Sequence, residues 1–351
     1  MEQICACTSA KQFDQRTLND RRKCAMRIRL GWVLSVAVSL WAGEAVAADI
    51  KVTLLGTGTP TPRLSAFSAS TLVEAGPERL IFDFGRGSSI RLFQKKIPIG
   101  SITAHFITHL HSDHLVGLPD MWLTGWIGTP WGSRKSPMLI YGPKGTVMMT
   151  ENLTKAFSED IRIRIDDEGY PPQGVAFDAH DIEPGLVYDH NGVKVSAIEV
   201  NHGDKIKPAF GYVVEYDGRK LVLSGDTKPD VRVEKAAEGA DLLIHEVAMI
   251  DPALLKDYPN YRAIEDHHTS PEEAGKIFAQ AKPKLVVYSH IVFATLPPVE
   301  EVPEEALTAR TRTSYQGPLI VGRDLMSFTI SDKVEAFAPD GKPLTPSVAA
   351  H

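Results

Sequence analysis

The chain has 351 residues, of which 43% are hydrophobic and 23% are charged, and its formal net charge is −6 at pH 7. The apolar fraction is that of a folded domain, and no low-complexity tract interrupts it, so a disordered or fibrous protein is excluded. An acidic chain does not attract a polyanion through its overall field. We therefore expect a small-molecule substrate and do not expect nucleic acid as a partner.

The first 48 residues have the pattern of a secretory signal. A basic start at Met26–Arg29 is followed by the apolar stretch Leu30–Ala42 and by small residues at Ala45–Ala48. This order is typical of a cleaved signal peptide, and the apolar stretch is short for a transmembrane span. We expect Met26 to be the true start and the mature protein to be periplasmic or secreted, without stable membrane association. An uncleaved anchor is the alternative.

Cysteine usage and linker patterns agree with this division. The three cysteines all precede the end of the signal segment, at Cys5, Cys7 and Cys24, so the mature chain would contain no thiol, as suits an oxidising compartment. Residues 49–333 contain no Pro/Gly/Ser linker and no internal repeat, which predicts one domain. Residues 334–351 are predicted to be a flexible tail, because their end is rich in Pro and Ala.

The segment Thr108–Leu118 carries the strongest chemical signal in the chain. It reads THLHSDHLVGL and holds four metal-competent side chains, His109, His111, Asp113 and His114. Such groups are costly to bury unless they are paired or bind a metal. The preceding run, Ile102–Ile107, is predicted to be a buried strand, and a helix should begin near His114. Because side chains alternate on an extended segment, His109 and His111 point to one side, and the following turn carries the other two to a second position.

Three later strands each lead to a further candidate ligand: Val193–Val200 to His202, Lys220–Leu223 to Asp226, and Leu285–Tyr288 to His290. Open α/β sheets place their sites at the carboxyl ends of strands, so these residues should meet the metal loop. His202 would complete a triplet with His109 and His111, whereas His290 would join Asp113 and His114, and Asp226 would bridge the two ions. These donors suit two Zn²⁺ ions, and Fe²⁺ or Mn²⁺ would also fit.

The order of these five histidines and two aspartates resembles the metallo-β-lactamase superfamily, whose signature is His-x-His-x-Asp-His. The resemblance extends over residues 50–330 and implies an α/β (α+β) fold, a four-layer αββα sandwich with the metals at one edge. The segments Leu54–Pro60 and Ile81–Gly85 also resemble the first hairpins of the family. Within them, Asp83 resembles a residue that braces the metal loop.

Two more motifs resemble one branch of this superfamily, the transfer-RNA 3′-processing ribonucleases (ribonuclease Z) and the related zinc arylsulfatases. Leu243–Glu246 resembles their His-Glu motif, and His267-His268-Thr269 resembles their His-Ser/His-Thr motif, before a predicted helix over residues 271–281. By this resemblance His267 works beside the metals and Glu246 orients it. A carboxylate bound to one ring nitrogen fixes the tautomer and leaves the other nitrogen for a leaving group. The register could shift by one, to His268.

The resemblance implies a dinuclear hydrolase in which the ions lower the pKa of a bound water from about 15.7 toward about 7, so that hydroxide attacks an ester. Asp113 would be a ligand that also orients this hydroxide. We expect an exported arylsulfatase or phosphodiesterase acting on sulfate or phosphodiester esters. A transfer-RNA 3′ nuclease is one alternative, disfavoured because Gly203–Gly225 has room for a hairpin but not for an RNA-gripping arm. Lactone or β-lactam hydrolysis, which would not need the Glu246–His267 pair, is another.

The remaining expectations concern the substrate wall and assembly. Trp122 and Trp126 follow the metal loop four residues apart and share a face of the predicted helix. That pattern fits core packing, and it also fits an aromatic substrate-binding wall, so both residues are candidates for substrate binding. Tyr258, Tyr261 and Phe293 are further candidates. A non-catalytic metal-binding protein is disfavoured because all seven ligand positions are filled. The sequence leaves a homodimer open.

Overall fold

The computed structural model describes residues 49–295 and 301–348. The predicted signal segment, within residues 1–48, lies outside the described residues. Within the described ranges, no helix combines the length and the apolar character needed to cross a membrane.

The first sheet has nine strands in the order β16-β15-β14-β1-β2-β3-β4-β5-β6. Its strands are β1 (Ile50–Gly56), β2 (Ser70–Ala75), β3 (Glu78–Phe82), β4 (Ala104–Phe106), β5 (Met138–Gly142), β6 (Phe177–Asp181), β14 (Ser327–Ile330), β15 (Val334–Phe337) and β16 (Pro343–Leu344). The second sheet has seven strands in the order β13-β12-β11-β10-β9-β8-β7. Its strands are β7 (Gly185–His190), β8 (Val193–Glu199), β9 (Phe210–Tyr216), β10 (Arg219–Leu223), β11 (Leu242–Ile250), β12 (Leu285–Ala294) and β13 (Leu319–Val321).

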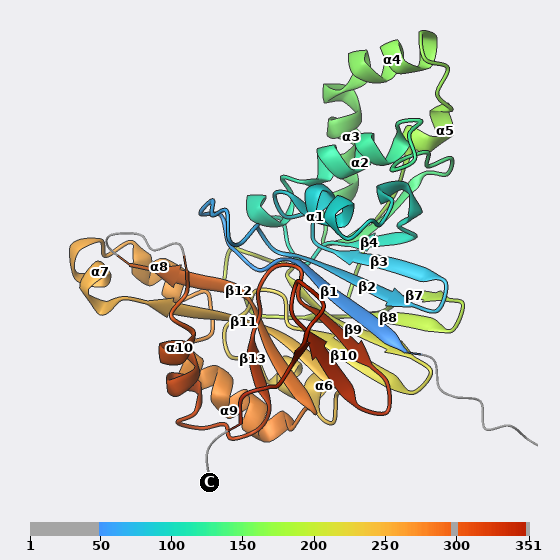
Figure 1. Cartoon of the computed structure of the whole chain (residues 1–351). Helices are drawn as coiled ribbons and strands as arrows, with labels where there is room; N and C mark the ends of the chain where they lie inside the picture. The colour runs from blue at the N-terminus through green and yellow to red at the C-terminus, as the bar shows by residue number, and fades with distance from the viewer. Residues whose placement is uncertain (1–48, 296–300, 349–351) are drawn as a thin grey trace, which may run out of the picture. The chain divides into compact units, whose positions relative to one another are not determined.

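The helices lie between these strands in the chain. They are α1 (Ser88–Gln94), α2 (Leu118–Trp126), α3 (Thr146–Ala156), α4 (Ser158–Asp166), α5 (Pro172–Val175), α6 (Val231–Ala237), α7 (Pro252–Asp257), α8 (Tyr261–Glu265), α9 (Pro271–Ala281) and α10 (Glu304–Thr311). Two short 3₁₀ turns, η1 (Ile99–Ser101) and η2 (Ser112–His114), precede β4 and α2. Helices α3 and α4 extend away from the sheets, and α7 and α8 lie beyond the ends of β11 and β12 (Figure 1).

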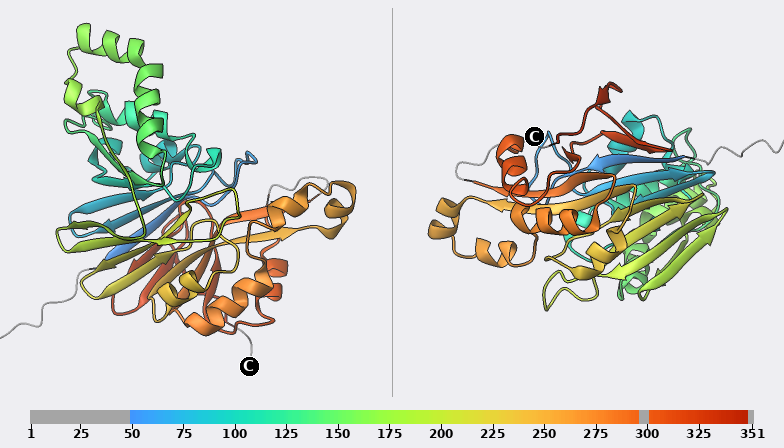
Figure 2. Two further views of the ribbon diagram at one scale, coloured as in Figure 1. Left: turned by 180° about the vertical axis from the view of Figure 1, so that it is seen from behind. Right: turned by 90° about the horizontal axis from the view of Figure 1, so that it is seen from below.

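The two sheets pack face to face with helices outside them (Figure 2). One apolar core joins their inner faces and includes Leu54 and Phe82 from the first sheet and Tyr212 and Leu221 from the second. A second core lies between the outer face of the first sheet and α2, and a third lies between the second sheet and α6, α9 and α10. This is the four-layer αββα sandwich that the sequence predicted.

Local sequence explains why individual elements form where they do. Strand β11 is buried at every position, as expected of a strand covered on both faces. Helix α9 spans the predicted residues 271–281: Ser270 and Glu273 form a capping box, and Pro271 occupies the first turn, where its missing N–H costs nothing. Its buried face, which includes Ile277 and Phe278, packs on the second sheet.

Two predictions about the C-terminal half need correction. Residues 334–344, expected to be a flexible tail, instead form β15 and β16, which extend the first sheet from β14. The prediction rested on the Pro- and Ala-rich end of the chain, and it overlooked the strand at Val334–Phe337. Strand β12, expected to end at Tyr288, continues to Ala294, with a register shift opposite Glu246 that places two residues of β12 against one of β11. Such a β-bulge re-aims side chains beside active sites.

The direction of the strands determines where the site forms. Strands β1, β3 and β4 share one direction, since β1–β2 and β2–β3 are antiparallel and β3–β4 is parallel. By the same reasoning β8, β10, β11 and β12 share one direction in the second sheet. The segments that carry the candidate ligands follow the carboxyl ends of these strands, except for His290, which lies in the bulge of β12.

Candidate metal centre and catalytic site

Asp83 anchors the metal loop to the end of β3. It is buried and has a positive φ of 63°. Its Oδ1 accepts the Thr108 N–H at 2.8 Å, and its Oδ2 accepts the Thr108 hydroxyl at 2.8 Å and lies 2.8 Å from His114 Nδ1. This carboxylate therefore fixes the start of the loop and the orientation of the His114 ring, as the family resemblance implied for Asp83.

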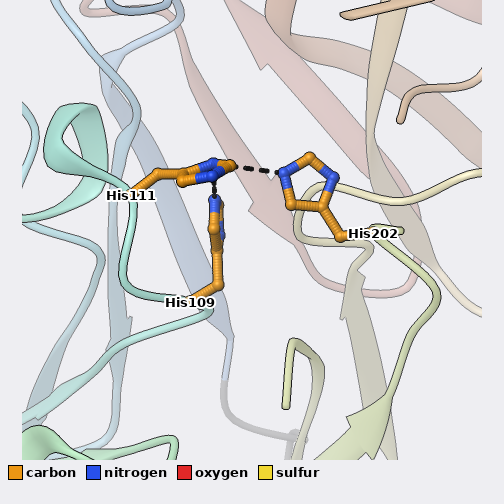
Figure 3. A group of neighbouring side chains, drawn as sticks. All are labelled: His109, His111 and His202. Atoms are coloured by element: carbon orange, nitrogen blue, oxygen red, sulfur yellow. Dashed lines mark hydrogen bonds between the residues drawn. The ribbon is translucent and has the colours of Figure 1, made fainter. Parts of the chain in front are cut away.

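Three histidines from two sheets converge on one point (Figure 3). His109 Nε2 lies 2.9 Å from His111 Nδ1, and His202 Nε2 lies 3.3 Å from the same nitrogen. The opposite nitrogen of His202 contacts the carbonyl of His267 at 3.0 Å, which fixes its tautomer because a carbonyl can only accept. The structure thus brings together the three nitrogens that the sequence assigned to one ion.

A second group lies on the other side of the same loop. Asp113, His114 and His290 place one possible ligand atom each within 4.8 Å of one another. His290 Nε2 lies 3.2 Å from Asp113 Oδ2. His290 sits in the β12 bulge with a φ of 43°, a left-handed conformation that turns its side chain toward the first sheet.

Asp226 lies between the two groups, where a bridging ligand is expected. Its Oδ2 lies 3.3 Å from His290 Nε2 and 3.4 Å from His114 Nε2 in the second group. The same oxygen lies 3.8 Å from both His109 Nε2 and His202 Nε2 in the first. One carboxylate oxygen therefore faces both predicted metal positions.

The donor set fits a pair of metal ions. Burial lowers the pKa of His109 well below its ordinary value and that of His202 to about 4, so both rings are neutral at pH 7 and can offer a lone pair. His114 Nε2 is buried without a hydrogen-bond partner among the described residues, yet it faces Asp226 and Asp113. Burial would lower the pKa of His114, but the Asp226 and Asp83 carboxylates raise it well above its usual value. The carboxylates around His114 therefore favour a positive charge at this position, which either a proton or a metal ion can supply.

The Glu246 carboxylate pairs with His268, and this answers the question of register. Glu246 Oε2 lies 3.0 Å from His268 Nδ1, and Oε1 accepts the Thr269 N–H at 2.7 Å. Burial works against the protonation of His268, but Glu246 outweighs it and raises the pKa of His268 to about 9. The histidine oriented by the glutamate is therefore His268, where the sequence had favoured His267.

His267 lies at the cavity without a carboxylate partner in the described chain. Its backbone carbonyl holds His202, and its side chain is half-buried beside Gly203. A Cβ at Gly203 would lie 2.8 Å from the His267 ring, and its φ is +111°, so only glycine fits there without a shift. The side chain of His267 thus borders the site, whereas its backbone supports a ligand.

The cluster of candidate ligands borders a cavity of about 300 Å³. One wall comes from the loop after β1, with Arg63; the other comes from α8 and the end of β12, with Tyr261 and Phe293. Arg63 reaches across this gap, since its Nη2 donates to the Phe293 carbonyl at 2.6 Å. Arg63 was missed in the sequence, although the loop that carries it follows β1, whose carboxyl end lies at the same edge as that of β4.

Trp122 and Trp126 do not reach this cavity, so of the two roles that their spacing allowed, core packing is correct and substrate binding is not. Both side chains are buried in the core outside the first sheet, at 0% and 1% exposure. Their indole N–H groups donate to the carbonyls of Val175 and Pro171 at 2.8 and 2.9 Å. Helix α2 turns its aromatic face inward, so these residues stabilise the fold.

Comparison with known proteins agrees with this architecture. A family model described as "Beta-lactamase superfamily domain" matches residues 72–291. The ribonuclease Z of Mycobacterium sp. (strain KMS) is 34% identical over 279 residues, covering 79% of this chain and 94% of that protein. The ribonuclease Z of Mycolicibacterium paratuberculosis (strain ATCC BAA-968 / K-10) is 36% identical over 279 residues, covering 79% of this chain and 96% of that protein.

Solved structures show the same fold. The crystal structure of YhfI, a metallo-β-lactamase-fold protein from Bacillus subtilis, has a TM-score of 0.63 at 17% identity and covers 80% of this chain and 100% of its own. Human tRNase Z, short form, has a TM-score of 0.57 at 23% identity and covers 80% of this chain and 98% of its own. At these identities the two structures bear on the fold alone.

The ribonuclease Z relatives correct two expectations. The expectation of an arylsulfatase or small-molecule phosphodiesterase was wrong, because the relatives that match most of the chain are ribonucleases. The expectation that nucleic acid is not a partner was wrong for the same reason. Its physical basis was the net charge, which is a sum over the whole chain and does not fix the charge at the site, where Arg63 lines the cavity. The short hairpin β9–β10 was predicted correctly, but it did not exclude an RNA substrate.

Proposed function

Because the chain belongs to the ribonuclease Z family of the β-lactamase superfamily, we propose that it hydrolyses a phosphodiester bond of RNA, at the 3′ end of transfer-RNA precursors. The chain is a metal-dependent hydrolase that acts on ester bonds. The observation that carries the RNA proposal is the 34% identity to a ribonuclease Z over 94% of that protein. The pairing of Glu246 with His268 beside the ligand cluster supports it.

We propose Zn²⁺ for both metal positions, because histidine nitrogens and aspartate oxygens are donors that zinc prefers. His109, His111 and His202 would hold one ion, Asp113, His114 and His290 the other, and Asp226 both. When bound, the ions would supply Lewis-acid chemistry: they lower the pKa of a water and neutralise charge on the phosphate.

The protein groups around the ligands supply the remaining chemistry. Glu246 holds the Nδ1 side of the His268 ring, which leaves Nε2 for the cavity that His268 lines. There it would give a proton to the departing ribose oxygen, a poor leaving group that needs one. Asp113 also lines the cavity, where its carboxylate can accept a hydrogen bond from the attacking water and orient it.

The cavity walls suit a nucleotide rather than a bare sulfate ester. Arg63 uses Nη2 for the Phe293 carbonyl and pairs with no carboxylate of the described residues, so its other N–H groups can meet a phosphate. Tyr261 and Phe293 supply aromatic surface at the opposite wall. Unpaired bases of RNA stack on such side chains.

The test is cleavage of a precursor transfer RNA that carries a 3′ trailer, by the zinc-loaded protein. We expect one cut at the junction with the trailer, and little cleavage of p-nitrophenyl sulfate. A stem-loop RNA of the same length with the same trailer is the matched control. Cleavage of both RNAs alike would argue against transfer-RNA precursors, and turnover of the sulfate without RNA cleavage would refute the proposal.

A further inference from the structure

His245 is a buried histidine that neither the metal centre nor the proposed proton transfer uses. Its side chain is fully buried in β11, directly before Glu246, and its ring lies edge-to-face with Phe278 of α9 at a centroid distance of 5.4 Å. In the sequence it is the histidine of the segment Leu243–Glu246, in which only Glu246 was given a role. Its hydrogen bonds nevertheless connect it to the residue that orients His268.

The tautomer of His245 follows from its partners. Nδ1 lies 2.6 Å from the backbone carbonyl of Glu246, and because a carbonyl can only accept, Nδ1 carries the proton and donates. Nε2 is then a bare acceptor, and it has no hydrogen-bond partner in the described part of the chain. A buried leucine at this position would have no unpartnered nitrogen. The advantage of histidine over leucine here is the hydrogen bond from its Nδ1–H to the Glu246 carbonyl.

That bond falls where the pairing of β11 with β12 is interrupted. The register of β11 and β12 shifts between His245 and Val247, so Glu246 faces the bulge that presents His290. The backbone N–H of Glu246 donates to Ser224 Oγ at 3.0 Å, and its carbonyl accepts from His245. Side chains therefore hold both polar groups of the Glu246 main chain at the interruption in the ladder.

We propose that His245 is a positioning residue: its Nδ1–H fixes the Glu246 peptide opposite the β12 bulge, so that the Glu246 carboxylate meets both Thr269 N–H and His268 Nδ1. Without this bond the Glu246 main chain would keep only the Ser224 contact of the two described above, and a shift of its Cα would misalign the carboxylate with His268. The inference rests on the proposed role of Glu246 and His268 in proton transfer, but it does not depend on RNA as the substrate.

The experiment compares His245→Leu, which removes the donor, with His245→Asn, whose amide N–H lies where Nδ1–H does. The readout is kcat/KM of the zinc-loaded protein on a series of aryl methyl phosphates with leaving groups from p-nitrophenol to phenol. We expect His245→Leu to lose at least about tenfold more on phenol than on p-nitrophenol, out of the about 10²–10⁴ that a positioned acid contributes. His245→Asn should restore most of this loss. His105→Leu is the matched control, because His105 is equally buried, with Nδ1 3.0 Å from the Leu139 carbonyl, but is remote from Glu246.

A purely structural role predicts a different result. His245→Leu would then lower all rates equally, as His105→Leu should. That outcome would overturn the proposal, as would a His245→Asn variant that is no more active than His245→Leu.

If His245→Leu does not fold, His245→Gln replaces it, since its longer side chain displaces the amide from the Nδ1 position. In the Glu246→Gln background, His245→Leu should add no further leaving-group dependence. If neither His268→Ala nor His245→Leu loses more kcat/KM on the phenol substrate than on the p-nitrophenol substrate, the proposed proton transfer fails. If His268→Ala shows this larger loss and His245→Leu does not, this inference alone fails.

Discussion

Replacing Glu246 with glutamine should uncouple His268 from the site while preserving the shape of the side chain. The carboxylate accepts two buried donors, the Thr269 N–H at 2.7 Å and His268 Nδ1 at 3.0 Å. Glutamine has one acceptor oxygen, so one donor would face its NH₂ group. Loss of a hydrogen bond to a charged group costs about 1.5–3 kcal/mol. We expect the free energy of unfolding to fall by this amount, and kcat/KM for poor leaving groups to fall by about 10² or more, as for a misaligned general acid.

The assay pairs denaturant unfolding at saturating zinc with turnover of p-nitrophenyl and phenyl methyl phosphates. Saturation matters because bound metal itself stabilises the folded chain. Glu273→Gln is the matched control: Glu273 accepts from Ser270 in the capping box of α9 and does not contact His268. If Glu246→Gln loses equally on both substrates, or behaves as Glu273→Gln does, the assignment of Glu246 as the orienting carboxylate is refuted.

Three further outcomes follow from the site and the core. His268→Ala should lose about 10²–10⁴ in rate on substrates with poor leaving groups. His267→Ala keeps the carbonyl that holds His202 and should stay within about tenfold of the wild-type rate. If His267→Ala loses more than His268→Ala, then His267 is the proton donor. Asp226→Ala should lose metal and activity together in elemental analysis and turnover assays, and full metal content would exclude a bridging role. Trp122→Ala should lower the free energy of unfolding by about 3–5 kcal/mol, measured in denaturant, with kcat of the folded fraction unchanged; a selective loss of kcat would return Trp122 to the substrate wall.

The candidate metal ligands could be recognised in the sequence because they follow a local rule. His202 and Asp226 each come just after an apolar strand, and strands that share a direction end at the same edge of a sheet. The helix over 271–281 was equally accessible, since its capping box and Pro271 lie next to each other in the chain. Such features need no knowledge of distant contacts.

The choice between His267 and His268 needed the folded chain. The two residues are adjacent, and only the turn after α8 decides which ring meets Glu246 and which backbone carbonyl meets His202. The same limit applies to Trp122: periodicity predicts a shared helix face but not what covers that face. The substrate class also could not be predicted from composition, because the net charge is a sum over the whole chain and does not give the charge at the cavity. The signal segment at Met26–Ala48 lies outside the described residues and stays a prediction, which N-terminal sequencing of the exported and retained protein would test.

The most direct test of the account replaces the leaving oxygen at the scissile bond of a precursor transfer RNA with sulfur. A thiol ionises near pH 8.5, far more readily than an alcohol, so the sulfur departs without a donated proton. We expect the wild-type protein to cleave both RNAs at the same bond. His268→Ala should lose about 10²–10⁴ on the oxygen substrate and less than about tenfold on the sulfur one. Equal losses on both would contradict the role of His268, and no cleavage of either RNA by the zinc-loaded wild type would contradict the assignment as a transfer-RNA nuclease.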